Sequence, residues 1–219
     1  MVLELSWTTL LIVVAYLLGS IPTGYLAGRL LKGIDIREQG SGSTGATNVL
    51  RTLGKGPGAV VLLVDAAKGA GAIALVYAFY ALTGTSVMPD LWKPWLVALV
   101  AFMALIGHSK SVWINFTGGK SVATGLGVLL AMSWLVGLGT LGIFAIALAL
   151  SRIVSLSSIT SAIAVPVLMI LLGQPLPYQI FAGIAGLYVI WRHHSNIQRL
   201  LNGTEPQIGQ PLNSEVKSS

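Results

Sequence analysis

The segment from Gly40 to Arg51 has the composition of an anion site. It reads Gly-Ser-Gly-Ser-Thr-Gly-Ala-Thr-Asn-Val-Leu-Arg, so three glycines lie among small hydroxyl side chains and a guanidinium follows. Glycines let backbone amides converge on an oxyanion, and Arg51 suits bidentate binding of a phosphate. The Gly-Lys-Ser/Thr ending of a nucleotide-binding P-loop is absent. We interpret the segment as a candidate phosphate cradle, with a flexible polar turn as the alternative.

A second candidate anion site begins at His108 and ends at Lys120. Gly118-Gly119-Lys120 opens an apolar run that predicts a helix, so the lysine would add its charge to the free amides of a helix N-terminus. A lysine that only extends its stem toward the membrane surface is the alternative. His108 can act as an acid or base, or it can be a hydrogen-bonded structural histidine.

Two further groups of polar side chains interrupt apolar sequence. Asp65 and Lys68 are three residues apart on one helical face, which indicates either a functional polar interior or an ion pair that neutralises both. The segment around Ser155 supplies several hydroxyl donors and one arginine, Arg152. Alone, this second group is a weak signal.

A last group lies near the C-terminus. His193 and Asn196 are three residues apart, so they share a face of a helix. The neighbouring Arg192 and Arg199 fit ordinary anchors at a cytoplasmic membrane surface as well as they fit substrate ligands.

All these residues lie between, or at the ends of, segments apolar enough to cross a membrane. Hydrophobic residues make up 54% of the 219-residue chain and charged residues only 9%, against about 25% in soluble domains. We predict an all-α polytopic membrane protein with about seven transmembrane helices, a single domain over residues 1–202, and a disordered tail over 203–219. The predicted spans are 6–28, 57–82, 93–107, 120–134, 136–151, 157–173 and 177–191.

The distribution of basic residues predicts how the spans are oriented. Cytoplasmic loops are enriched in Lys and Arg, and with seven spans twelve of the thirteen basic residues lie on one side or at its helix ends. We therefore expect the N-terminus outside, the C-terminus inside, and active-site loops that face the cytoplasm. Lys93 is the exception. The basic residues on the predicted cytoplasmic side are Arg29, Lys32, Arg37, Arg51, Lys55, Lys68, Lys110, Lys120, Arg152, Arg192, Arg199 and Lys217.

Composition and spacing exclude several chemistries. The chain has no cysteine, which excludes disulfides, thiolate metal sites and a cysteine thioester. Its three histidines have no carboxylate cluster at ligand spacing, so we predict no metal and no cofactor. There is no Gly-x-Ser-x-Gly elbow and no His-x-x-x-x-Asp signature of acyl-CoA-dependent acyltransferases. Because the basic residues are scattered between apolar spans, we expect membrane lipid and phosphorylated small molecules as partners, and no nucleic acid.

Taken in order along the chain, these motifs resemble those of the bacterial acyl-phosphate:glycerol-3-phosphate acyltransferase family, usually called PlsY. The resemblance implies a seven-helix enzyme of phospholipid biosynthesis in the bacterial cytoplasmic (inner) membrane. It would transfer a fatty acyl group from acyl phosphate to the sn-1 hydroxyl of glycerol 3-phosphate, and it would be functionally coupled to the enzyme that forms acyl phosphate. The motifs are Gly19-Ser20-Ile21-Pro22-Thr23-Gly24-Tyr25, the Ser41 to Arg51 segment, Asp65-Ala-Ala-Lys68-Gly69, the Gly107-His108 to Lys120 segment and Arg192-His193-x-x-Asn196-Ile197.

The resemblance also implies roles for individual residues, and the chain departs from the family's usual Asn at Ser43. Acyl transfer would depend on a predicted catalytic set of Ser41, Arg51, His108 and Lys120. The acyl-phosphate group would be held by Ser41, Gly45, Ala46, Thr47 and Asn48. Glycerol 3-phosphate would be bound by Arg51, Lys120, His193 and Asn196, while His108, Lys68 and Ser155 would shape or charge the pocket.

Two questions stay open at the level of sequence. The base that takes the hydroxyl proton is His108, His193 or a phosphate oxygen of the substrate. A membrane transporter of phosphorylated solutes is the competing function, and it is disfavoured because the predicted outer loops carry almost no polar residues.

Overall fold

The computed structural model describes residues 2–210, and over this range the protein is built from helices without any regular strand. Three short 3-10 helices, Ile36–Glu38, Asp90–Trp92 and Val112–Ile114, lie in the connections. The α-helices are α1 (Val2–Ser20), α2 (Thr23–Lys32), α3 (Ala46–Leu53), α4 (Lys55–Thr83), α5 (Lys93–Ser109), α6 (Val122–Met132), α7 (Trp134–Ser151), α8 (Val154–Leu171), α9 (Leu176–Arg192) and α10 (His194–Leu201).

Each predicted span corresponds to helical structure, with one difference in the first. Where one continuous span over 6–28 was expected, the chain breaks at Ile21 and Pro22, because proline has no backbone N–H and disfavours helical geometry in the residue before it. Five segments of the described chain are long and apolar enough to cross a membrane. Helix α6 has 11 residues and α9 has 17, so a total of seven crossings stays a prediction.

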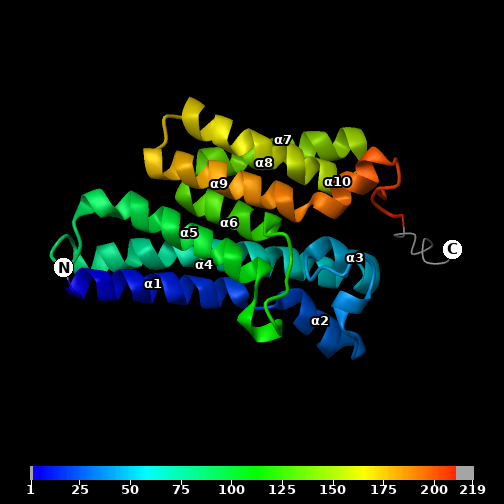
Figure 1. The fold of residues 1–219 in the computed structure, drawn as a ribbon, viewed down its shortest axis with the longest axis horizontal. Coiled ribbons are helices and arrows are strands. Elements are labelled where there is room, and N and C mark those ends of the chain that lie inside the picture. The colour runs from blue at the N-terminus through cyan, green and yellow to red at the C-terminus, as the bar shows by residue number, and fades with distance from the viewer. Residues whose placement is uncertain (1, 211–219) are drawn as a thin grey trace.

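The long helices form two layers. Helices α1, α4 and α5 make one layer and α7, α8 and α9 make the other, with the short α6 between them (Figure 1). The apolar core surrounds α5, where Val97, Val100 and Ala104 are completely buried. Leucines on the outer faces, such as Leu63 and Leu187, remain exposed, as expected for surfaces in contact with lipid.

Glycines allow two pairs of helices to approach until their backbones touch. A Cβ atom on Gly127 of α6 would lie 1.8 Å from the carbonyl oxygen of Ala66 in α4. A Cβ atom on Gly19 of α1 would lie 2.2 Å from the carbonyl oxygen of Ala104 in α5. Small residues at contacts are the usual means by which transmembrane helices pack closely. Helix α6 is therefore held directly against α4, which fixes where α6 begins.

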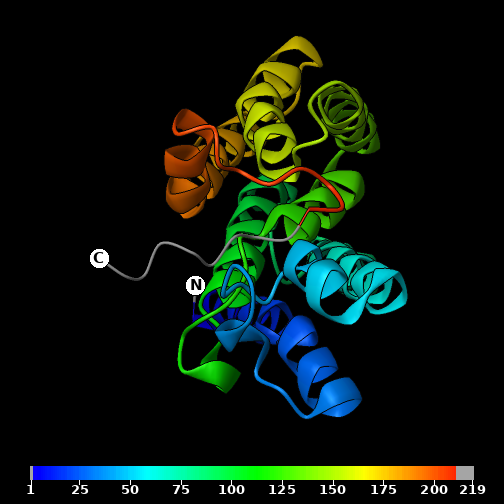
Figure 2. The ribbon, with the colours of Figure 1, turned by 90° about the vertical axis from the view of Figure 1, so that its right-hand side faces the viewer.

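The segments singled out by the sequence gather at one end of the helices. This end carries α2, α3, α10 and the connection from α5 to α6, whereas the N-terminus lies at the opposite end (Figures 1 and 2). Arg37 joins two of these segments, because its guanidinium pairs with Asp35 at 2.7 Å and donates to the carbonyl of Ile114 at 3.1 Å. The loop that contains Thr117 is thereby tied to the segment before α3.

The segment after α10 differs from the expected disordered tail in its first part. Residues 203–210 run back over the helix ends, where Arg51 donates to the carbonyl of Pro206 and Ile208 donates to the carbonyl of Arg152. The reason is an acidic side chain, Glu205, which is only 8% exposed and is bonded within the bundle. Residues 211–219 of the expected tail lie outside the described range.

Candidate active site

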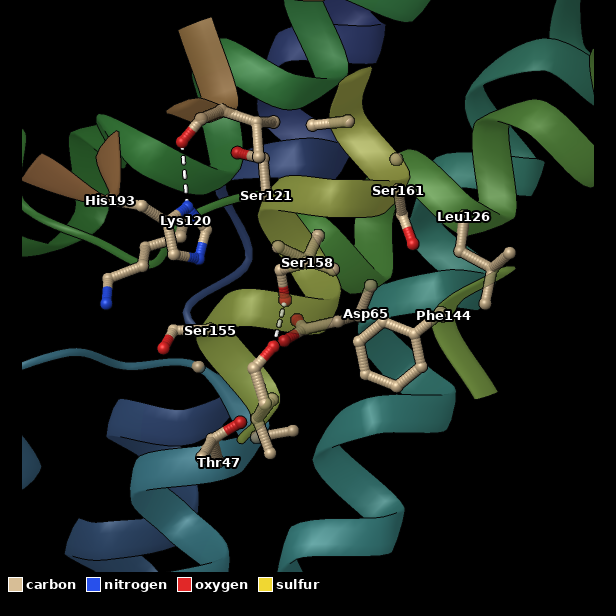
Figure 3. A pocket seen from close by; sticks show the side chains of 18 of the residues that line it. Thr47, Asp65, Lys120, Ser121, Leu126, Phe144, Ser155, Ser158, Ser161 and His193 are labelled. Atoms are coloured by element: carbon tan, nitrogen blue, oxygen red, sulfur yellow. Dashed lines mark hydrogen bonds between the residues drawn. The ribbon is translucent and has the colours of Figure 1, made fainter. Parts of the chain in front are cut away.

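A single cavity joins the predicted site segments. It lies between α4, α6, α7, α8 and α9, and its polar wall is formed at the end of the bundle where α3 and α10 lie. Deeper in the bundle the wall is apolar, with Leu126, Phe144, Val165 and Phe181 among its side chains. Figure 3 shows Lys120, His193 and Ser155 on one side of this space and Leu126 and Phe144 on the other. The cavity therefore suits a ligand with a charged head and an apolar chain.

The first polar segment is organised by Asn48. Its buried side-chain amide donates to the carbonyls of Ile36, Gln39 and Ser43, and its oxygen accepts from the backbone N–H of Ser41 at 3.0 Å. The Ser43 hydroxyl accepts from the N–H of Gly45, a turn-forming bond that asparagine can also make, so the departure from the family's usual residue keeps the local geometry. Asn48 thus fixes the curve of the loop before α3.

The second polar segment is a tight turn packed between two side chains. The N–H of Gly119 donates to the carbonyl of His108 at 3.2 Å. From the opposite side, Arg192 donates to the carbonyls of Gly118 and Gly119 at 3.3 and 2.9 Å. Lys120 follows directly and its ammonium donates to the side-chain oxygen of Asn196. Arg192, which the sequence fitted equally well to a membrane anchor, is therefore part of the framework that holds Lys120.

The charge state of Lys120 follows from its surroundings. Burial lowers the pKa of Lys120 to about 8, Glu205 opposes this shift, and the guanidinium groups of Arg199, Arg192 and Arg51 add to it. Water-poor surroundings and neighbouring cations both disfavour the ammonium form. Most Lys120 side chains are still charged at pH 7, but the charge is lost over the next two pH units.

His193 lies beside Lys120 and is neutral near pH 7. Burial lowers its pKa to about 4, and the Lys120 ammonium contributes to the shift. Its Nδ1 lies 2.7 Å from the carbonyl of Val189, which fixes Nδ1 as the protonated nitrogen and leaves Nε2 as an acceptor. The imidazole can therefore accept a hydrogen bond from a hydroxyl group in the cavity.

Glu205 is a residue of the candidate site that sequence analysis missed. One carboxylate oxygen accepts from the Ser155 hydroxyl at 2.7 Å and from the Asn196 amide at 2.6 Å, and the other pairs with Arg199 at 2.6 Å. Burial alone would raise the pKa of Glu205, but these three donors outweigh it and hold the pKa below its ordinary value. The only signal in the sequence was an acidic residue soon after the last helix, within a segment whose composition predicted disorder.

The structure brings together all but one of the predicted site residues. Those that line the cavity are Ser41, Gly45, Ala46, Thr47, Asn48, Arg51, His108, Lys120, Ser155, His193 and Asn196. Lys68 does not line it, because its ammonium pairs with Asp65 at 2.9 Å and donates to the carbonyl of Ile21 at 2.9 Å. Asp65 lines the cavity instead. Within residues 2–210, no three His, Asp or Glu side chains gather as they would around a metal ion.

Comparison with known proteins places the chain in a family. The family model described as "Glycerol-3-phosphate acyltransferase" matches residues 9–203. A glycerol-3-phosphate acyltransferase of Trichormus variabilis is 62% identical, with 99% of each chain covered. One of Acaryochloris marina is 63% identical over 91% of this chain and 92% of the relative.

Solved structures give the same result. A crystal structure of PlsY, an integral membrane glycerol 3-phosphate acyltransferase in its glycerol 3-phosphate form, has a TM-score of 0.83 and 36% identity, over 92% of this chain and 96% of that one. A second crystal structure of PlsY, in a lysophosphatidic acid form, has a TM-score of 0.79 and 35% identity, over 92% and 95% of the two chains. The chain therefore belongs to the glycerol-3-phosphate acyltransferase family.

Proposed function

We propose that this protein transfers a fatty acyl group from acyl phosphate to the sn-1 hydroxyl of glycerol 3-phosphate, which yields lysophosphatidic acid and phosphate for phospholipid biosynthesis. It does so as a multi-pass protein of the bacterial cytoplasmic membrane, with its active site facing the cytoplasm. The observation that carries the proposal is one cavity that has a cationic polar end and an apolar deep end. Its relatives, named for glycerol 3-phosphate, support the identity of the acceptor.

The polar end suits two phosphorylated substrates. Arg51 and Lys120 line it, and Arg192 and Arg199 contribute positive charge from close by. Two phosphate groups repel each other in free solution, and fixed cations offset this repulsion at no cost of reorganisation during the reaction. Arg51 and Lys120 hold the phosphate of glycerol 3-phosphate, while the loop from Ser41 to Asn48 holds the phosphate of the donor.

The deep end suits a fatty acyl chain. Along α8, the cavity wall extends from Ser155 to Val165, which are ten residues and ~15 Å apart at the rise of an α-helix. The aromatic rings of Phe144 and Phe181 and the side chain of Leu126 complete an apolar wall. A chain of methylene groups in this space is stabilised by about 0.8 kcal/mol for each group removed from water.

Acyl transfer in this cavity needs no covalent intermediate. The sn-1 oxygen attacks the acyl carbonyl carbon, a tetrahedral oxyanion forms, and the bond between this carbon and the phosphate oxygen breaks as phosphate leaves with the bonding electrons. Lys120 and Arg51 stabilise the negative charge at each stage. Neutral His193 accepts a hydrogen bond from the attacking hydroxyl through Nε2, but a pKa of about 4 makes it a weak base. The departing phosphate is therefore the final acceptor of the proton.

His108 supports this site and does not carry out proton transfer. Its ring is confined between the Asp65 carboxylate, 3.6 Å from Nδ1, and Gly119, where an added Cβ atom would lie 2.1 Å from Nε2. Both ring nitrogens therefore face groups of the protein, which favours a supporting role over that of a general base.

The proposal is tested with purified protein in detergent or in vesicles. Palmitoyl phosphate and glycerol 3-phosphate are supplied together, and the product is identified by mass spectrometry and by cleavage that distinguishes sn-1 from sn-2 esters. We expect sn-1 lysophosphatidic acid and one equivalent of phosphate, and no product when palmitoyl-CoA replaces the donor. Turnover of palmitoyl-CoA, or acylation at sn-2, would overturn the assignment of donor or position.

A further inference from the structure

Asp65 is a buried carboxylate for which the proposed reaction has no direct use. Its side chain is 2% exposed and lies in the wall of the cavity, although both substrates are anions. Three groups contact it. The Thr23 hydroxyl donates to it at 3.1 Å, the Lys68 ammonium lies at 2.9 Å and Nδ1 of His108 lies at 3.6 Å. Gly119 then packs on the far edge of the His108 ring.

The contacts form a continuous path from Asp65 to Lys120. Asp65 attracts Nδ1 of His108, and Nε2 of the same ring meets the Cα of Gly119 so closely that an alanine would not fit. The backbone of His108 also receives the N–H of Gly119. Lys120 is the next residue, so a rotation of the His108 ring would move the base of the Lys120 side chain.

We propose that Asp65 is a positioning residue which, through His108, holds the Gly118–Gly119 turn so that the Lys120 ammonium meets the phosphate of glycerol 3-phosphate. The inference rests on the proposed function, because it supposes that the Gly118–Gly119 turn positions Lys120 to bind the phosphate of glycerol 3-phosphate. Arg192 holds the same turn from the opposite layer of helices. The turn is thus fixed between a carboxylate-supported imidazole in one layer and a guanidinium in the other.

The alternative roles of Asp65 lead to different behaviour. If Asp65 were a general base on the substrate hydroxyl, its removal would lower kcat whether or not Lys120 is present. If Asp65 formed only a structural ion pair with Lys68, its removal would lower stability and reduce activity equally in every background. A positioning role requires that the effect of Asp65 disappear once Lys120 has been removed, because the path then ends at a side chain that no longer binds phosphate.

The test is a double-mutant cycle. Removing Asp65 alone would leave the Lys68 ammonium buried without its carboxylate. The variant is therefore Asp65→Asn combined with Lys68→Met, called the charge-free pair, which removes both charges together. It is compared in the native background and in a Lys120→Ala background, and kcat/KM for glycerol 3-phosphate is measured at fixed palmitoyl phosphate. Asp90→Asn, at an exposed acidic residue in the connection before α5, is the matched control.

We expect the charge-free pair to lose at least about tenfold in kcat/KM, mainly as a raised KM, because a displacement of ~1 Å in a site can cost ~100-fold. In the Lys120→Ala background the further loss should be below about threefold. Equal losses in both backgrounds would overturn the positioning role. Gly119→Ala, which displaces the turn from its other side, should show the same non-additivity, and it decides the question if the charge-free pair does not fold.

The native protein separates this inference from the proposed function. If it makes no lysophosphatidic acid, the proposed reaction fails, and the cycle is then measured as the rise in Tm caused by glycerol 3-phosphate. If the charge-free pair and Lys120→Ala each reduce this Tm rise, and their combination reduces it no more than Lys120→Ala alone, positioning is supported. Independent reductions that add would contradict it.

Discussion

Deprotonation of the Lys120 side chain should set the alkaline limit of enzyme activity. Its pKa of about 8 means that the ammonium form falls from roughly nine-tenths at pH 7 to roughly one-tenth at pH 9. Because kcat/KM reports groups of the free enzyme, kcat/KM for glycerol 3-phosphate should fall about tenfold between these values. In kcat the limit should lie at higher pH, since a bound phosphate dianion stabilises the ammonium form.

Unfolding would not account for this loss. The pKa of Lys120 is below its ordinary value of 10.5 in the folded protein, so the unfolded chain binds more protons between pH 8 and 10.5. The contribution of Lys120 to the free energy of unfolding therefore rises with pH over this interval, while activity falls. Tm measured in the same buffers separates the two effects.

The decisive comparison is with arginine at this position. Lys120→Arg keeps the positive charge at every accessible pH, so the residual activity of this variant should lose the limb near pH 8. Lys55→Arg, at the exposed lysine that is the first residue of α4, is the control and should retain this alkaline limb. An alkaline limb that stays near pH 8 in Lys120→Arg would refute the assignment of this limb to Lys120.

Three further outcomes follow from the structure. Glu205→Gln should reduce the free energy of unfolding by about 2 kcal/mol, because it loses a charge-assisted hydrogen bond to Arg199; an unchanged thermal transition would contradict this. Gly127→Ala should separate α6 from α4 and lower Tm, whereas Gly142→Ala, at a glycine with open space around its Cα, should not. A cysteine in place of Ser43 should react with an impermeant thiol reagent in inverted vesicles only, and labelling of right-side-out vesicles would contradict the proposed orientation.

The helices and the site loops were predictable because the physics that specifies them is local. Apolar runs of about 20 residues predict membrane helices, and glycine-rich segments with Arg51 and Lys120 predict anion sites wherever they fall in the chain. All the predicted site residues except Lys68 line one cavity. Lys68 and Asp65 are equally ionisable and one helical turn apart, so the pattern could not show which of them faces the cavity.

The roles of Glu205 and Arg192 depend on contacts that sequence spacing does not encode. Glu205 is bonded to Ser155, which is 50 residues away in the chain, and Arg192 is bonded to Gly118, which is 74 residues away. An acidic residue in a segment rich in Gly, Pro and Ser looks like a solvated one until the fold provides it with donors. The break at Pro22 was visible as a residue type, but the long apolar run around it outweighed the signal.

The central claim is that both substrates occupy one cavity and that the acyl group passes directly between them. Initial rates measured over a grid of palmitoyl phosphate and glycerol 3-phosphate concentrations test it most directly, since a ternary complex and an acyl-enzyme give different double-reciprocal patterns. The account predicts lines that intersect, with lysophosphatidic acid formed only when both substrates are present. Parallel lines, together with phosphate released from palmitoyl phosphate alone in an amount stoichiometric with the enzyme, would contradict it.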